Sequence, residues 1–125
     1  MEGSNANGKA VVNLTRGSDD GESATIAFLV GTAALGKGKQ VVTFLTKEAV
    51  HLALPGNADA IEVEGIPPLS RLFEQYREGG GELLVCPICF DARGLDADAL
   101  VENAKLGGGT PLWEWIGEGA TVFSY

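Results

Sequence analysis

Two cysteines three positions apart carry the most reactive chemistry in this chain. Cys86 directly follows residues 82–85, an apolar run that is typical of a buried strand. Pro87 comes next and favours the first position of a helix, so Cys86 is expected to cap that helix. Free amides and the positive end of the helix dipole stabilise a negatively charged sulfur at such a position. The thiolate is the nucleophilic form of cysteine, and Cys86 is therefore the candidate reactive group.

Cys89 is expected one turn along the same face of that helix. It is a candidate resolving thiol, which would form a disulfide with an oxidised Cys86. A Cys-Pro-x-Cys sequence after a strand is also typical of thiol–disulfide oxidoreductases, which gives a second hypothesis. In those folds the motif follows an early strand, whereas here it lies in the last third of the chain. A plain packing role stays open for both cysteines.

The remaining polar candidates are few. His51, the single histidine, falls in a predicted loop after the second strand, where it could protonate a leaving thiolate or be a solvated bystander. Arg93 is interpreted as a cation at the end of the Cys86 helix or as a subunit contact. Two cysteines and one histidine do not supply a tetrahedral ligand set within one chain, so we expect no metal site and no cofactor.

Composition narrows the classes of partner. A chain of 125 residues suits one domain, and its net charge of −8 argues against nucleic acid as a direct partner. Residues 1–8 are polar and lack the apolar segment of a secretory signal, so they are expected to form a disordered tail. No run is long and apolar enough to span a membrane. We therefore expect a cytoplasmic protein whose thiols stay reduced.

Strand-like and helix-like segments alternate along residues 9–125. Strands are predicted at 9–15, 40–45, 82–85 and 120–125, and helices near 20–35, 68–78 and 110–117, while 95–106 fits either a helix or a strand. Asp19 followed by Glu22 resembles a capping box, and Thr110-Pro111 resembles a cap followed by a first helical residue. This alternation predicts a single-domain α/β fold, a three-layer α/β/α sandwich with a mainly parallel sheet. The helix at 20–35 is apolar on every side, which favours a subunit interface.

In a parallel sheet, ligands bind beyond the carboxyl ends of the strands. The loops expected at that edge contain the cysteine motif and His51. We predict four residues of these loops as binding residues: Asp19, Asp20, Pro87 and Thr110.

The arrangement of strand, Gly-Ser-Asp-Asp loop, helix, Gly-Lys turn, and later Cys-x-x-Cys-(x)3-Arg-Gly resembles the DsrE/TusD-like sulfur-relay proteins, the YchN-like group. In that resemblance Cys86 matches the cysteine that takes up a persulfide sulfur, and Cys89 matches a second cysteine of one subgroup. Asp19 and Asp20 match an acidic loop after the first strand. The resemblance implies trimers or hexamers, with partner proteins that donate and accept sulfur.

The function expected from residues and resemblance together is a sulfur carrier that accepts a persulfide sulfur on Cys86 and passes it on. Such a protein is a sulfurtransferase-like carrier more than a turnover enzyme. Two alternatives stay open: a thiol–disulfide oxidoreductase using Cys86 and Cys89, and a non-catalytic oligomeric binding scaffold.

Overall fold

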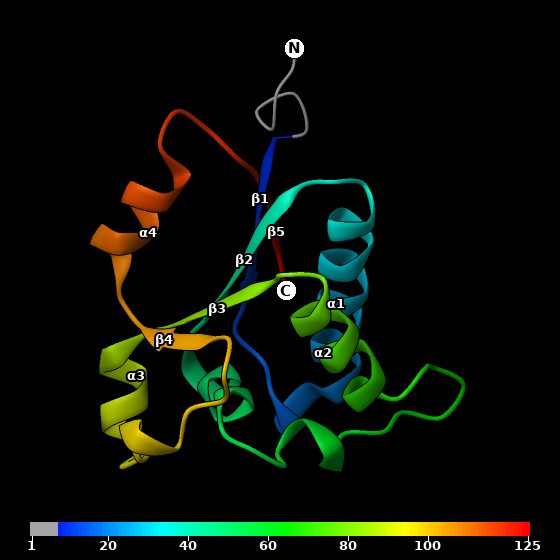
Figure 1. The fold of residues 1–125 in the computed structure, drawn as a ribbon. Helices are drawn as coiled ribbons and strands as arrows, with labels where there is room; N and C mark the ends of the chain where they lie inside the picture. Colours follow the sequence, from blue (N-terminus) through cyan, green and yellow to red (C-terminus); the bar gives the residue numbers. More distant parts are fainter. Residues whose placement is uncertain (1–7) are drawn as a thin grey trace.

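The computed structural model describes residues 8–125, in which strands and helices alternate along the chain (Figure 1). The strands are β1 (Lys9–Leu14), β2 (Gln40–Leu45), β3 (Glu82–Val85), β4 (Ala104–Leu106) and β5 (Thr121–Ser124). The α-helices are α1 (Gly21–Gly36), α2 (Leu69–Glu78), α3 (Pro87–Ala92) and α4 (Gly109–Ile116). Four 3-10 segments connect them: η2 (Ser18–Asp20), η3 (Lys47–Ala53), η4 (Ala58–Ala60) and η5 (Ala97–Ala99).

The five strands form one sheet in the order β4-β3-β2-β1-β5, and every neighbouring pair is parallel. The predicted parallel sheet is therefore confirmed. The register pairs Leu45 with Leu14 on one side and with Val85 on the other, and Val85 in turn pairs with Leu106. Because these residues end their strands, the loops that follow β1, β2, β3 and β4 start at one common edge.

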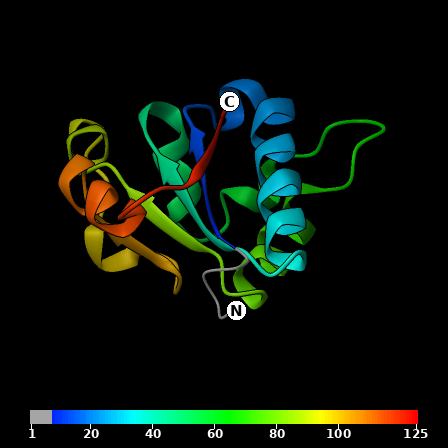
Figure 2. The ribbon, with the colours of Figure 1, turned by 90° about the horizontal axis from the view of Figure 1, so that it is seen from above.

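Helices lie on both sides of the sheet, so the predicted α/β/α sandwich is also confirmed. Helices α1 and α2 pack on one face, and α3 and α4 lie on the other side (Figure 2). The main core fills the space under α1 and α2, where Tyr76, Phe28 and Leu14 are fully buried. On the opposite face, Val42 and Leu84 are buried beside α4. Strands that are apolar on both faces are typical of a parallel sheet covered on both sides.

Helix α1 buries one side and exposes apolar side chains on the other. Ala24, Ala27, Phe28 and Gly31 are buried against the sheet and α2, whereas Leu29 is 44% exposed. The apolar sequence of this helix is thus only partly explained by contacts within the domain.

Two predicted helix starts are wrong. Asp20, not Asp19, caps α1, because a 3-10 turn over residues 18–20 places the second aspartate next to the first free amides. The last helix begins at Gly109, with Gly108 as its cap, so Thr110 is already inside the helix. Proline is tolerated in the first turn, where its missing N–H has no partner in the helix, so Pro111 does not mark the first residue.

Residues 95–106, whose sequence fits either a helix or a strand, form one short turn and one short strand. Asp96 caps η5, and its carboxylate accepts a hydrogen bond of 2.9 Å from the Asp98 amide. Strand β4 then covers three residues at the edge of the sheet. The expected disordered tail falls on residues 1–7, outside the described part of the chain, and on Gly8, whose carbonyl accepts from the Gln40 amide at 3.2 Å. Among the described helices, none combines the length and apolar character that crossing a membrane requires.

Candidate functional site

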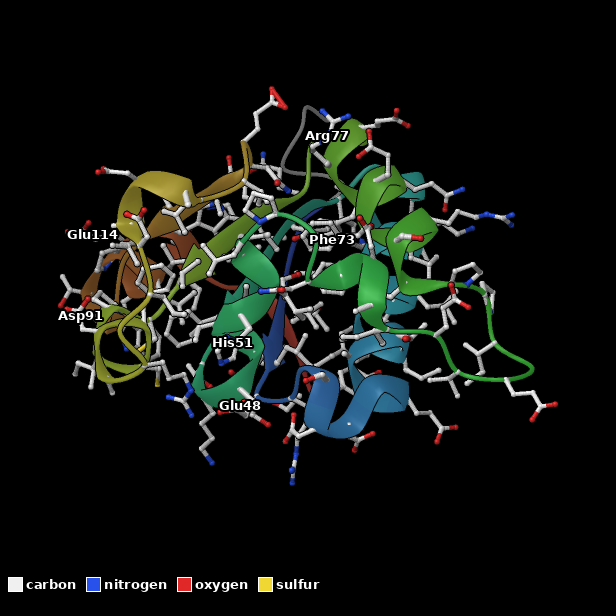
Figure 3. The ribbon with its side chains drawn as sticks, turned by 90° about the horizontal axis from the view of Figure 1, so that it is seen from below. Glu48, His51, Phe73, Arg77, Asp91 and Glu114 are labelled. Atoms are coloured by element: carbon white, nitrogen blue, oxygen red, sulfur yellow. The ribbon has the colours of Figure 1, made fainter. Side chains whose placement is uncertain are left out.

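The candidate site lies at the carboxyl edge of the sheet, which Figure 3 views directly from below. Residues 15–20 follow β1, η3 follows β2, α3 follows β3, and residues 107–108 follow β4. The would-be Cβ of Gly108 lies 3.8 Å from Cδ of Pro87, so the loop after β4 touches the start of α3. The edge therefore gathers the segments that the sequence predicted there.

Cys86 occupies the cap position of α3, and Pro87 is the first residue of the helix. The Cys86 amide donates to the Leu45 carbonyl at 3.0 Å, and the Cys86 carbonyl accepts from the Phe90 amide at 3.0 Å. The side chain is partly buried, is not in a disulfide, and makes no capping hydrogen bond. The amides of Ile88 and Cys89 precede the first intrahelical bond, so the helix itself gives them no carbonyl partner. These two amides are the donors that a capping side chain at position 86 would use.

Cys89 lies one turn further along α3 in a different environment. It is partly buried and packs against the main core, next to the fully buried Phe90. Ile88, between the two cysteines, is 80% exposed. The motif therefore presents one cysteine at the start of the helix and turns the other towards the interior. Neither cysteine forms a disulfide.

An ion pair that the sequence did not predict joins α3 to the loop after β2. Arg93 Nε donates to Glu48 Oε2 at 2.9 Å, and Arg93 Nη1 donates to the Cys89 carbonyl at 3.2 Å. The other carboxylate oxygen of Glu48 lies 3.6 Å from His51 Nε2 (Figure 3). The interpretation of Arg93 as a helix-end cation is confirmed by its bond to the helix carbonyl. The link to Glu48 spans 45 positions, and no local sequence pattern indicated it.

The two aspartates after β1 are engaged in local bonds. Asp19 accepts from the Gly17 amide at 2.8 Å, and this bond, together with Arg16, holds the pKa of its carboxyl below the usual value. Asp20 accepts from the Ser23 hydroxyl at 2.8 Å and from the Ser23 amide at 3.1 Å, which lower its pKa in the same way. Both carboxylates shape the turn into α1, and a binding role for them stays a prediction.

Thr110 and His51 differ in how exposed they are at the carboxyl edge of the sheet. Thr110 is exposed in the first turn of α4. His51 is partly exposed, and its main-chain carbonyl accepts from Asn57 Nδ2 at 2.7 Å and from the Leu54 amide at 3.2 Å. Roles for these residues in sulfur chemistry stay predictions. Among residues 8–125, no group of three or more His, Cys, Asp or Glu side chains is arranged to hold a metal ion.

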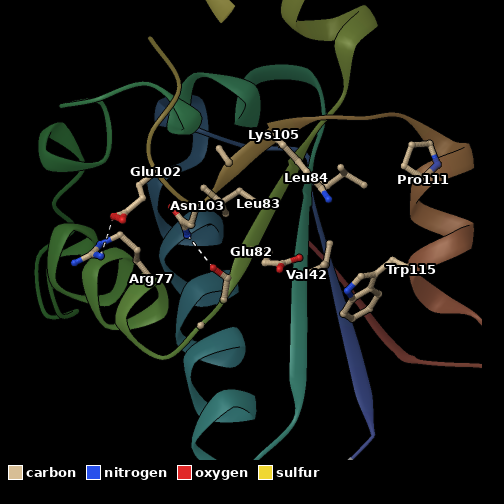
Figure 4. A pocket seen from close by; sticks show the side chains of 13 residues that line it. Val42, Arg77, Glu82, Leu83, Leu84, Glu102, Asn103, Lys105, Pro111 and Trp115 are labelled. Carbon is tan, nitrogen blue, oxygen red and sulfur yellow. Dashed lines mark hydrogen bonds and ion pairs between the residues drawn. The ribbon is translucent and has the colours of Figure 1, made fainter. Parts of the chain in front are cut away.

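A cavity of about 420 Å³ lies away from the cysteines, between the sheet and α4 (Figure 4). Trp115 and Pro111 of α4 line one end, and Arg77, Glu102 and Asn103 line the other. Arg77 and Glu102 pair with each other at 3.1 Å, and Asn103 Nδ2 donates to the Gly81 carbonyl at 2.9 Å. The cavity does not include Cys86, so it is not where a persulfide would form.

Comparison with known proteins identifies relatives over nearly the whole chain. A family model described as the DsrE/DsrF-like family matches residues 9–125. An uncharacterised protein of Methanopyrus kandleri is 30% identical over 104 residues, which cover 83% of each chain. An uncharacterised protein of Methanocaldococcus jannaschii is 24% identical over 106 residues, which cover 85% of this chain but 38% of that longer protein.

Solved structures share the fold at low sequence identity. The YchN protein of E. coli superposes with a TM-score of 0.76 at 18% identity, covering 94% of this chain and 99% of that one. A protein of unknown function from Methanobacterium thermoautotrophicum gives a TM-score of 0.67 at 14% identity, covering 94% of this chain and 98% of that one. These structural matches establish the fold of the chain and carry no information on its chemistry.

Proposed function

Because the chain belongs to the DsrE/DsrF-like family over residues 9–125, we propose that it is a sulfur carrier whose Cys86 accepts and passes on a persulfide sulfur. The single observation that carries the proposal is the position of Cys86. A free thiol caps a helix at the carboxyl edge of a parallel sheet, beside amides that the helix leaves without partners.

The proposed step needs no cofactor. The Cys86 thiolate attacks the outer sulfur of a persulfide on a donor protein. A sulfur–sulfur bond forms at Cys86, the sulfur–sulfur bond of the donor breaks, and the donor cysteine leaves as a thiolate that takes up a proton. The same exchange, with Cys86 as the donor, passes the sulfur to the thiolate of an acceptor protein. Amide donors at the helix start stabilise the anionic sulfur in each direction.

Mass spectrometry after incubation with a persulfide-loaded cysteine desulfurase tests the proposal. The expected product is the intact chain with one added sulfur atom on Cys86. Cys86→Ser should gain none, and Cys89→Ser should gain as much as the natural sequence. A chain that stays unmodified, or that carries the sulfur on Cys89, would contradict the proposal.

A thiol–disulfide oxidoreductase is the second candidate, because both thiols are free and lie within one turn of α3. This candidate requires a Cys86–Cys89 disulfide that forms under oxidation and is reduced by thioredoxin. The core packing of Cys89 favours a structural role for that residue. If neither sulfur uptake nor disulfide cycling is observed, the non-catalytic scaffold is the remaining candidate.

The proposal also includes a setting for the carrier. We propose that the protein works in the cytoplasm as a homo-oligomer, together with a protein that donates the sulfur and one that accepts it. The exposed Leu29 on α1 and the exposed Phe123 on β5 support a contact between subunits. Size-exclusion chromatography with light scattering tests this part, and a monomer at micromolar concentration would contradict it.

A further inference from the structure

Helix α3 is too short to fix its own orientation. It has six residues and buries the side chain of only Phe90. Helices of this length are not stable alone in water, so contacts with the rest of the domain determine how this one lies. Its first amides follow the cap residue, Cys86, directly in the chain. Contacts at the C-terminal end of α3 therefore also determine the direction in which those amides point.

Arg93 holds that far end. It follows the last residue of α3, and its guanidinium donates to the Cys89 carbonyl at 3.2 Å and to Glu48 Oε2 at 2.9 Å. Carbonyls in the last turn of a helix lack helical partners, so the first of these bonds satisfies such a group. The planar guanidinium offers donors at fixed angles, and one side chain thus ties the end of α3 to η3.

Glu48 is itself held from two sides. Its carbonyl lies 2.7 Å from the would-be Cβ of Gly17, so the turn after β1 packs directly on its main chain. Its second carboxylate oxygen lies 3.6 Å from His51 Nε2. The side chains of Glu48 and Arg93 are 43% and 28% exposed, so solvent screens this pair less than a fully exposed one.

Three of the contacts that hold α3 are spread along its length. The Cys86 amide bonds to Leu45 at the start, Phe90 is buried in the middle, and Arg93 bonds to Glu48 at the end. We propose that Glu48 and Arg93 are a positioning pair, which holds α3 so that its unpaired first amides stay next to its cap residue, Cys86. The inference rests on the proposed function, since it assigns these residues to the reactivity of Cys86. Neither residue contacts the transferred sulfur.

The test measures the reactivity of the Cys86 thiol in a Cys89→Ser background, in which Cys86 is the single cysteine of the chain. The variants are Glu48→Gln, Arg93→Lys, Arg93→Gln and the double Glu48→Gln/Arg93→Gln. The readouts are the rate of alkylation by iodoacetamide and the ultraviolet absorbance of the thiolate, both at neutral pH. Both are taken at a temperature where circular dichroism shows every variant folded.

Glu48→Gln and Arg93→Gln are each expected to slow alkylation roughly three- to tenfold and to lower the thiolate absorbance. The double variant should be no slower than the slower single one, because both changes break the same link. Arg93→Lys should be as slow as Arg93→Gln, because lysine keeps the charge but cannot make both bonds. Glu102→Gln, which breaks the ion pair with Arg77 at the other end of the sheet, is the matched control and should react at the natural rate.

Two results would overturn the inference: natural reactivity in Glu48→Gln, even if its unfolding temperature falls, or natural reactivity in Arg93→Lys. Sulfur uptake from a loaded desulfurase separates this failure from failure of the proposed function. Uptake by the natural sequence together with an unaffected Glu48→Gln variant would refute the positioning pair alone. Slowed alkylation in Glu48→Gln without uptake by the natural sequence would refute the sulfur carrier alone.

Discussion

The hydroxyl of Thr43 donates a hydrogen bond of 2.9 Å to the phenol oxygen of Tyr76, deep inside the domain. The phenol in turn donates to the Glu82 carbonyl at 2.7 Å, so three groups on β2, α2 and β3 are joined. Burial is the main cause that raises the pKa of Tyr76 well above its ordinary value, which keeps the phenol protonated as a donor. This connection braces the strand that leads to Cys86.

Tyr76→Phe is expected to destabilise the fold by about 1–3 kcal/mol, because it leaves a buried hydroxyl and a strand carbonyl without their partner. Urea unfolding followed by circular dichroism measures the change. Thr43→Val, alone and combined with Tyr76→Phe, completes a double-mutant cycle in which the losses should not add. Additive losses would show that Thr43 and Tyr76 are not coupled, and no loss in Tyr76→Phe would show that the connection contributes nothing.

Asp20 should make the stability of the fold depend on pH at the acid end. Bonds from Ser23 to the charged carboxylate hold its folded pKa below the unfolded value of about 3.9. The carboxylate therefore stabilises the fold above that value, and this contribution is lost as the pH falls through the lower folded pKa.

Asp20→Asn is therefore expected to be less stable than the natural sequence at pH 7, with a gap that closes as the pH falls towards 2. Unfolding midpoints in urea, measured over a series of pH values, follow the gap. Asp59→Asn, a change at an exposed residue, is the control and should show no such convergence. A constant gap across the series would mean that the charge of Asp20 has no part in capping α1.

Lys47, the first residue of η3 and the neighbour of Glu48, adopts a left-handed backbone conformation with φ of 54°. This conformation costs residues other than glycine roughly 1–2 kcal/mol. Lys47→Gly is expected to raise the stability by about 0.5–1 kcal/mol, since the relief exceeds the extra entropy of an unfolded glycine. Thermal unfolding checks this, with Lys47→Val as the opposite case, which should lose stability. A less stable glycine variant would contradict the expectation.

Lys9 fastens helix α4 to the start of β1. Its ammonium donates to the Trp115 carbonyl at 2.7 Å and lies 5.2 Å from the centre of the Trp115 ring. No side chain of α4 is fully buried, so this attachment matters more than in a well-packed helix. Lys9→Met should accelerate hydrogen exchange of the α4 amides while changing global stability by no more than about 1 kcal/mol. Lys37→Met is the control, and equal exchange in Lys9→Met and the natural sequence would refute the attachment.

The sequence predicted the fold and the position of Cys86 because both depend on local patterns. Apolar runs of strand length, Gly and Pro at element ends, and the Cys86-Pro87 pair all act within a few residues. The cap of α1 was misplaced by one residue because two adjacent aspartates can both accept from free amides. Only the turn over residues 18–20 decides between them.

Other features depend on contacts that no local pattern encodes. The bond between Glu48 and Arg93 joins segments brought together by the pairing of β2 with β3. The cavity beside Trp115 arises from how α4 crosses the sheet, which sequence spacing does not specify. The start of α4 was also missed, because a proline is compatible with several positions in the first turn of a helix.

The hydrogen bond between the Cys86 amide and the Leu45 carbonyl has a consequence for how sulfur could travel. In the proposed sulfur carrier, the main chain of Cys86 is bonded to β2, so Cys86 would move a sulfur atom only by rotating its own side chain. The added sulfur would extend that side chain by only about 2 Å. Such a carrier would not move the sulfur from one protein to the next on a long flexible side chain. The proposed donor and acceptor proteins would instead each have to bring their own thiol to Cys86, one after the other.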